Sequence, residues 1–219
     1  MASTKVVAST IPEIDAKLKT FSGDMVRIEF LENCLKQLLP SDAKRFCHLK
    51  LADAYAYRLM WPLAARNMNA AAEEAVTFKD KINFYLKEVS LWMKVNDFMM
   101  IDKAFKKAML CANTAQDKEA IKNSIKMAML IQAEAYEKKN QRSNAARLYE
   151  RLLEMPVIST ETEKKHIIER LGVLNSKLGR LKDAVRYEMM GKRPIEMKRD
   201  PETDGVRKVS FEDLGIDSV

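Results

Sequence analysis

The stretch LGVLNSKLGRLKDAVRY, from Leu171 to Tyr187, decides the fold. Its apolar residues recur at helical spacing on both sides of Gly179, and glycine favours the left-handed conformation that ends many helices. The stretch therefore predicts two antiparallel helices joined by a short turn. Related stretches occur three more times upstream. A motif that recurs about every forty residues predicts stacked helical hairpins in which each unit contacts mainly its neighbours.

The second helix of each hairpin repeats three positions. A residue near its start marks the register, with successive spacings of 37, 44 and 39 residues: Ala64, Ile101, Ala145 and Ala184. Four residues later we expect a large side chain that fills the helix pair: Met68, Phe105, Tyr149 and Glu188, the last with Tyr187 beside it. Seven residues after the first mark, mostly small residues predict a close approach to the next unit: Ala71, Ala108, Leu152 and Gly191.

The first helix of each hairpin repeats one large residue, and a turn follows it. We expect this residue to face the partner helix in all four copies: Tyr55, Trp92, Tyr136 and Asn175. Polar residues or glycine then predict the turns at Asn96-Asp97, Asn140 to Ser143 and Gly179-Arg180. Pro62 is predicted to take the same place in the first hairpin. Pro40 and Pro156 are predicted to close hairpins, and Ser159-Thr160 to cap the helix that follows.

The composition fits an all-α protein. Of 219 residues, 47% are hydrophobic, which is enough for a continuous core. Only six residues are glycine and six proline, so we expect helices and no sheet. We predict a leader or partial first helix over 1–22, a helical-repeat domain over 23–191, and a mostly disordered tail over 192–219. Within the repeat domain, residues 23–39 read as the second helix of a degenerate unit whose partner runs from Ile14 to Phe21.

Cysteines, histidines and hydropathy exclude several classes of protein. Cys34, Cys47 and Cys111 are odd in number and widely spaced, which indicates core residues of a reduced, cytoplasmic protein. With only His48 and His166 to assist, we expect no metal and no cofactor. The sequence lacks a Ser-His-Asp pattern, a glycine-rich phosphate loop and an H-E-x-x-H motif, so we expect no enzyme. Charged residues interrupt every long apolar stretch, and no transmembrane segment is predicted.

These positions together resemble the tetratricopeptide repeat superfamily over Ala43 to Gly191. The resemblance rests on the leucine and small residue, the aromatic residue that follows, the glycine turn, the alanine and the closing proline. The spacings exceed the usual thirty-four residues, which makes the chain similar to the longer arrays of the soluble attachment proteins of membrane fusion. The resemblance implies a right-handed α-solenoid that accepts a peptide or helix of another protein on the face lined by first helices.

The same resemblance implies a binding surface on the first helices. Two positions of each first helix, seven residues apart, share one side. Six of these eight positions are basic, and we expect all but Ile131 to bind an acidic peptide or helix: Lys50, Lys87, Arg170, Tyr57, Lys94, Lys138 and Lys177. The competing interpretation is an ordinary solvated helix face.

The sequence thus predicts a non-catalytic scaffold or adaptor whose partner is another protein. Two alternatives stay open. The net charge of +7 and the lysine-rich helices would also suit an RNA- or ribonucleoprotein-associated factor. A membrane-trafficking adaptor could use the same basic surface against anionic lipid or a helical bundle. Because the ends of stacked arrays are uncovered, self-association is a further expectation.

Overall fold

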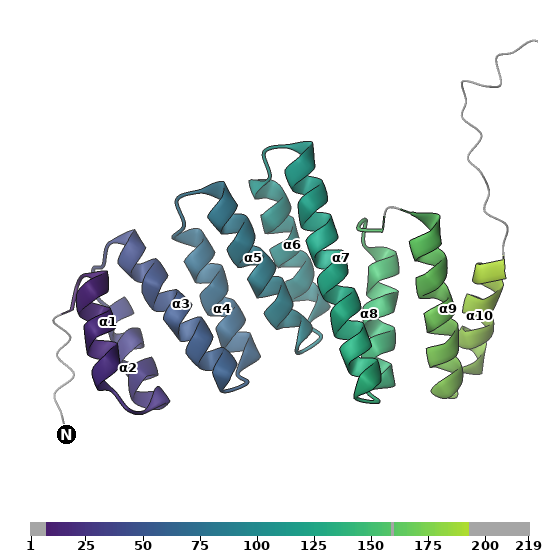
Figure 1. Ribbon diagram of the computed structural model, residues 1–219, viewed down its shortest axis with the longest axis horizontal. Helices are drawn as coiled ribbons and strands as arrows, with labels where there is room; N and C mark the ends of the chain where they lie inside the picture. Colours follow the sequence, from purple (N-terminus) through teal and green to yellow (C-terminus); the bar gives the residue numbers. More distant parts are fainter. Residues whose placement is uncertain (1–7, 159, 193–219) are drawn as a thin grey trace, which may run out of the picture.

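The computed structural model describes residues 8–158 and 160–192, and within them the chain forms ten α-helices and no strand (Figure 1). The helices are α1 (Ile11–Thr20), α2 (Asp24–Leu35), α3 (Ser41–Tyr57), α4 (Trp61–Glu73), α5 (Phe78–Met93), α6 (Phe98–Cys111), α7 (Ala115–Lys138), α8 (Arg142–Glu154), α9 (Glu161–Lys177) and α10 (Leu181–Lys192). The predicted all-α class is confirmed for this part of the chain.

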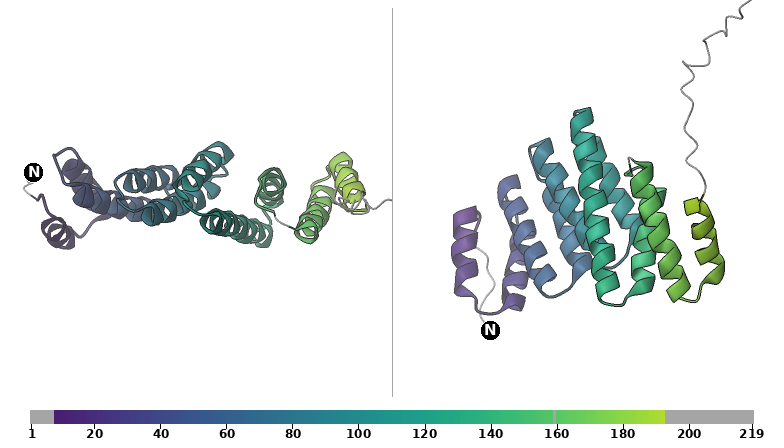
Figure 2. Two further views of the ribbon diagram at one scale, coloured as in Figure 1. Left: turned by 90° about the horizontal axis from the view of Figure 1, so that it is seen from above. Right: turned by 45° about the vertical axis from the view of Figure 1, so that its right-hand side comes forward.

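The helices pack as consecutive pairs. α3 packs on α4, α5 on α6, α7 on α8 and α9 on α10, and contacts of α4 with α5 and of α8 with α9 join successive pairs. In Figures 1 and 2 the odd-numbered helices form one layer and the even-numbered helices a second layer behind it. This arrangement is consistent with a helical repeat, as the recurring sequence motif predicts.

All four hairpins turn with the same backbone geometry. The residue two places before each second helix has a positive φ: Leu59 (60°), Asn96 (56°), Asn140 (59°) and Gly179 (73°). The next residue donates its backbone N–H to the carbonyl of the large first-helix residue: Met60 to Tyr55 (2.9 Å), Asp97 to Trp92 (3.2 Å), Gln141 to Tyr136 (2.8 Å) and Arg180 to Asn175 (2.9 Å). This is the Schellman ending of a helix, which pairs carbonyls that the helix leaves free.

The turn residue of the first hairpin differs from the expectation. Pro62 was expected to lie in the turn, but it is the second residue of α4, where a missing backbone N–H costs no helical hydrogen bond. Leu59 takes the turn instead. A leucine at positive φ is disfavoured because its Cβ approaches the following carbonyl oxygen.

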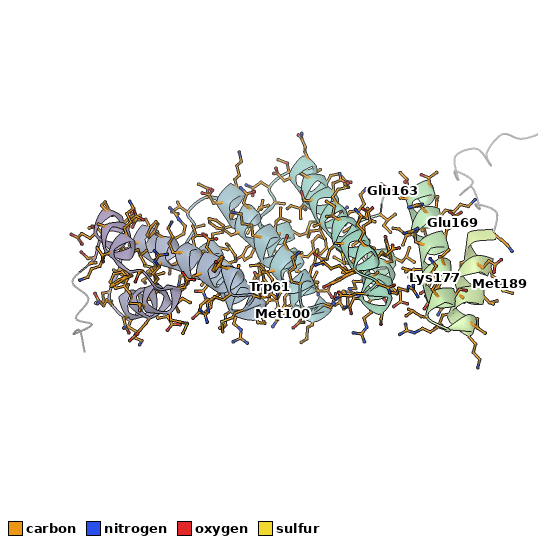
Figure 3. All side chains as sticks on the ribbon, turned by 60° about the horizontal axis from the view of Figure 1, so that its bottom comes forward. Trp61, Met100, Glu163, Glu169, Lys177 and Met189 are labelled. Atoms are coloured by element: carbon orange, nitrogen blue, oxygen red, sulfur yellow. The ribbon has the colours of Figure 1, made fainter. Side chains whose placement is uncertain are left out.

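The predicted register holds in the interior hairpins. Ala64, Ile101 and Ala145 are each the fourth residue of their helix and are fully buried, and the large residues four places later are buried too. The last hairpin departs from it: Glu188 is exposed, and Tyr187 beside it is half-buried. No residue of α10 is buried, because no described helix covers its outer side, where Met189 points outward (Figure 3).

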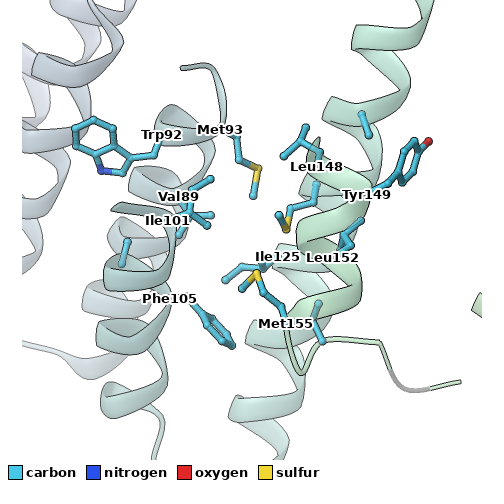
Figure 4. Close-up of a cluster of buried hydrophobic side chains, with 14 of the residues drawn as sticks. Val89, Trp92, Met93, Ile101, Phe105, Ile125, Leu148, Tyr149, Leu152 and Met155 are labelled. Atoms are coloured by element: carbon cyan, nitrogen blue, oxygen red, sulfur yellow. The ribbon is translucent and has the colours of Figure 1, made fainter. Parts of the chain in front are cut away.

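The core is continuous through the middle of the array. Buried side chains of α4 to α9 form one cluster, in which Met93, Ile125 and Leu148 come from three different helices (Figure 4). A second cluster joins α1, α2 and α3 and contains Ile14, Leu31 and Leu51. Large-to-small changes at such fully buried positions typically cost about 2–5 kcal/mol.

The ends of the array refine the predicted boundaries. α1 begins at Ile11, three residues before the expected start, and it buries Ile14 and Leu18. α2 ends at Leu35, so 36–40 form a connector rather than helix. The predicted tail overlaps the structure only at Lys192, which ends α10; the remainder, 193–219, and the start of the leader, 1–7, lie outside the described residues.

Candidate interaction surface

The eight positions singled out on the first helices lie on the odd-numbered layer, and we call them the first-helix face. One column contains Lys50, Lys87, Ile131 and Arg170, and the other Tyr57, Lys94, Lys138 and Lys177. Seven are exposed and Arg170 is half-buried. Since seven residues rise about 10 Å along a helix, the face consists of two parallel rows. The second row lies where the first helices end.

Arg170 forms part of the helix packing. Its guanidinium pairs with the carboxylate of Glu137 on α7, and that carboxylate also accepts a hydrogen bond from the Tyr149 hydroxyl of α8 at 2.9 Å. The hydrogen bond to Glu137 raises the pKa of Arg170. Because these contacts tie α7, α8 and α9 together, Arg170 is committed to the fold more than the other residues of the face.

The five lysines of the face lie outside the salt bridges of the described residues, although the pKa of Asp15, lowered mainly by its hydrogen bond to Lys19, is lowered further by the charge of Lys50. None of them forms a salt bridge with a described carboxylate. Lys94 donates to the Gln132 side-chain oxygen at 2.7 Å, and the ammonium of Lys50 lies 5.3 Å from the centre of the Phe46 ring. Asp53 and Glu134 are exposed on the same side of their helices, but five lysines outnumber these two acids.

Besides a hollow of about 950 Å³ between α9 and α10 that includes Lys177, two hollows lie along the odd-numbered layer. The first of these two, of about 720 Å³, lies between α1, α2 and α3 and contains Lys50 and Tyr57. Its charged lining residues, three cations and three acids, balance one another: Lys19, Arg27, Lys50, Asp15, Asp24 and Asp53. A smaller one of about 190 Å³ lies between α5 and α7, with Lys87 at its rim. The sequence did not reveal the first hollow, because the two short helices that wall it carry little of the repeat pattern.

The sequence patterns also did not predict a second feature, the edge of the array along which the hairpin turns lie. We define the turn edge as residues 57–61, 93–98, 138–142 and 177–181, which run from the end of each first helix to the start of the next. In Figure 1 these turns line up along the lower edge of the array. The opposite connector edge contains residues 35–41, 73–78, 111–115 and 154–161.

The turn edge exposes apolar side chains in its first two hairpins. Tyr57 (80%), Leu59 (68%) and Met60 (40%) are exposed in the first turn, and Met99 (71%) lies next to the second. Figure 3 turns this edge toward the viewer, with Trp61 and Met100 at it and Glu163 at the far end of α9. The run of apolar residues from Leu59 to Trp61 is the signal of this surface in the sequence.

One buried carboxylate lies between α4 and α5. Glu88 is 2% exposed, and its oxygens accept hydrogen bonds from the Asn69 amide at 2.9 Å and the Trp92 indole at 3.0 Å. Burial raises the pKa of Glu88, which the two hydrogen bonds partly oppose. These contacts explain Glu88 as a packing residue that orients Trp92.

The thiols and other potential ligands form no site in the described part of the chain. Cys34 and Cys47 are buried free thiols that interact with each other between α2 and α3, and burial raises the pKa of Cys47 to about 12. Within residues 8–158 and 160–192 no group of three His, Cys, Asp or Glu side chains is placed to hold a metal ion. None of the described helices is long and apolar enough to cross a membrane.

Comparison with known proteins assigns no family. No protein family's sequence profile matches the chain, and no curated protein matches it. The geometry of the surface itself is therefore the basis for a functional conclusion.

Proposed function

We propose that the protein is a non-catalytic scaffold of the tetratricopeptide type, which holds an acidic peptide or helix of a partner protein on its first-helix face. The four hairpins with one shared turn geometry support such a right-handed array. In an array of this kind the odd-numbered helices line the concave side, where an extended partner contacts several hairpins at once.

The observation that carries the proposal is the set of five exposed lysines that lie outside the salt bridges of the described residues. They lie on four successive first helices, so an acidic segment that crosses the helices meets a cation on each. Exposed charges of this kind raise association rates and select against basic partners. Tyr57 and the apolar parts of the hollow beside Lys50 supply the contact area that charges alone lack.

Affinity capture from a native extract tests the proposal. The bait is the full chain, compared with K50E/K87E on the face and with K103E/K106E, whose lysines are exposed on α6 in the other layer. Both variants reverse two charges, so their net charges are equal. We expect one protein to be retained by the wild type and by K103E/K106E but lost by K50E/K87E, with no effect of nuclease.

Two results would contradict this function. Equal loss in both variants would show that net charge, rather than the first-helix face, governs capture. Loss of the captured material after nuclease treatment would instead support the RNA-associated alternative, since nucleic-acid binding depends on charge summed over many contacts.

A further inference from the structure

The turn edge combines strain with exposure at Leu59. Its φ of 60° is a conformation that leucine disfavours, whereas the equivalent positions of the other hairpins use Asn96, Asn140 and Gly179. The strained leucine is also 68% exposed, so it contributes little to the core of the protein. A residue that costs the fold free energy without being buried indicates a role outside the fold.

Leu59 does not stand alone. Met60 and Met99 are exposed near it, and Trp61 is half-buried at the start of α4. Methionine adapts its shape to irregular surroundings, and tryptophan favours the boundary between water and an apolar phase. The tip of the first two hairpins therefore presents a flexible apolar surface with one interfacial aromatic ring.

Cations lie along the whole turn edge, two of them in the first two turns beside this apolar surface and five in the other two turns. The turn edge contains seven basic residues and one acid, whereas the connector edge contains one basic residue and four acids. The one acid, Asp97, is engaged as the cap of α6, where its carboxylate accepts the Met100 backbone N–H at 3.1 Å. None of the seven cations forms a salt bridge with a described residue.

We infer that the turn edge binds the surface of an anionic membrane, with Leu59, Met60 and Met99 inserted among the lipid headgroups. The turns lie along one edge, with the α5–α6 turn set back from the others (Figure 1), so a surface that approaches this edge meets several of them. At the opposite edge three of the four acids form salt bridges with described residues: Glu73, Glu154 and Glu161. No turn-edge cation forms one with a described residue, so these cations favour an approach with the turns toward negative charge. The insertion of apolar side chains and the attraction of cations to anionic lipids both contribute to the free energy of binding, as they do in other peripheral membrane proteins.

Both edges expose apolar side chains, but they differ in their charged residues. Val76, Phe78 and Leu110 are exposed at or beside the connector edge, whose segments contain only one basic residue. An anionic lipid surface therefore finds fewer cations there than at the turn edge. The connector edge provides a control that exposes apolar side chains without the row of cations.

Sedimentation with phosphatidylcholine vesicles, with and without phosphatidylserine, tests the inference on the full chain. We expect the wild type to bind the vesicles with phosphatidylserine only. L59N/M60S/M99S should lower the partition coefficient about tenfold or more, and V76S/F78S/L110S should leave it unchanged. R58Q, K139Q and R180Q should each lower it about fivefold, because each removes one exposed cation from the edge.

The outcome separates this inference from the proposed function. Lys94, Lys138 and Lys177 belong to both surfaces, so the separating variants use residues that belong to one surface alone. L59N/M60S/M99S should still capture the protein partner, and K50Q/K87Q should still bind vesicles. A wild type that binds no anionic vesicle overturns the inference and leaves a protein contact as the role of the turn edge. Equal losses in the turn-edge and connector-edge variants overturn it as well. A melting temperature of L59N/M60S/M99S at or above that of the wild type excludes unfolding as the cause of its loss.

Discussion

The turn edge and the connector edge end the same helices but are built in different ways. At the connector edge the side chains of Thr77, Thr114 and Thr160 accept the backbone N–H of the third residue of α5, α7 and α9, at 3.0–3.2 Å. At the turn edge the backbone hydrogen bonds of the Schellman ending secure the first helices, and α4 and α8 have no side-chain cap.

The difference shows where side chains are free to serve another purpose. Polar side chains at the connector edge complete the helices, so changing them should affect stability. Most side chains at the turn edge are released from that task because the backbone alone closes the turn. Cations and exposed apolar groups accumulate on this released edge. The predictions below test this division, from the largest expected effect to the smallest.

Asn140→Val should break the turn edge at its backbone. A β-branched residue at a φ of 59° should destabilise the protein by about 2 kcal/mol, because its side chain crowds the following carbonyl. Urea unfolding measures the change. Gln141→Ala is the control, since its side chain makes no cap hydrogen bond and the change should stay within about 0.5 kcal/mol. Equal midpoints for wild type and Asn140→Val would contradict the assigned geometry.

Thr114→Ala should weaken the connector edge through a side chain. Its hydroxyl accepts the Asp117 backbone N–H at 3.0 Å, and losing an N-cap of this type costs about 1 kcal/mol. Thermal or urea unfolding detects the loss. A neutral Thr114→Ala together with a destabilising Gln141→Ala would contradict the claim that side chains stabilise the helix ends at the connector edge and the backbone does so at the turn edge.

Leu59→Asn should stabilise the fold. Asparagine tolerates positive φ better than leucine does, so the variant should gain about 0.5–1 kcal/mol while exposing no apolar group that was buried. The gain in unfolding free energy can be measured beside the loss of vesicle binding inferred above. A destabilised variant would show that Leu59 serves the fold, and its exposure would then need another explanation.

Glu88, in the interior between α4 and α5, should make the unfolding free energy depend on pH, and Glu88→Gln should remove this contribution. Burial raises the pKa of Glu88 in the folded state, so protonation favours folding. The stability of the wild type relative to Glu88→Gln should therefore rise as the pH falls from 7 through the raised pKa toward 4.5, the ordinary value. Urea unfolding at several pH values measures this difference. If the difference in unfolding free energy between wild type and Glu88→Gln did not change with pH, the raised pKa of the buried Glu88 would be contradicted.

The parts of the fold that sequence predicted are those where geometry restricts the residue type. Ala64, Ala145 and Ala71 lie where helices approach closely, so small residues mark the register. Thr160 caps α9 as expected because few side chains accept a backbone N–H at that position. Because few residue types fit such positions, their recurrence in a single sequence predicts the helix contacts and helix starts.

The missed features follow from interactions that leave no local pattern. Leu59 was overlooked because a turn was expected to need glycine, asparagine or proline, whereas backbone hydrogen bonds impose the turn on leucine. Arg170 was grouped with the exposed lysines, and only the fold, which brings this residue of α9 to Glu137 of α7, reveals their pairing. Glu188 was expected to fill a helix pair, but it is exposed because no described helix covers the outer side of α10.

Fluorescence quenching by brominated lipids would test the role of the turn edge most directly. The chain has two tryptophans: Trp61 at the turn edge, and Trp92, which is buried and donates to Glu88. We predict that anionic vesicles with brominated acyl chains quench the fraction of the wild-type emission that comes from Trp61. Brominated vesicles without phosphatidylserine should not. Bound protein whose emission is unchanged would show that another surface meets the lipid and would contradict the account.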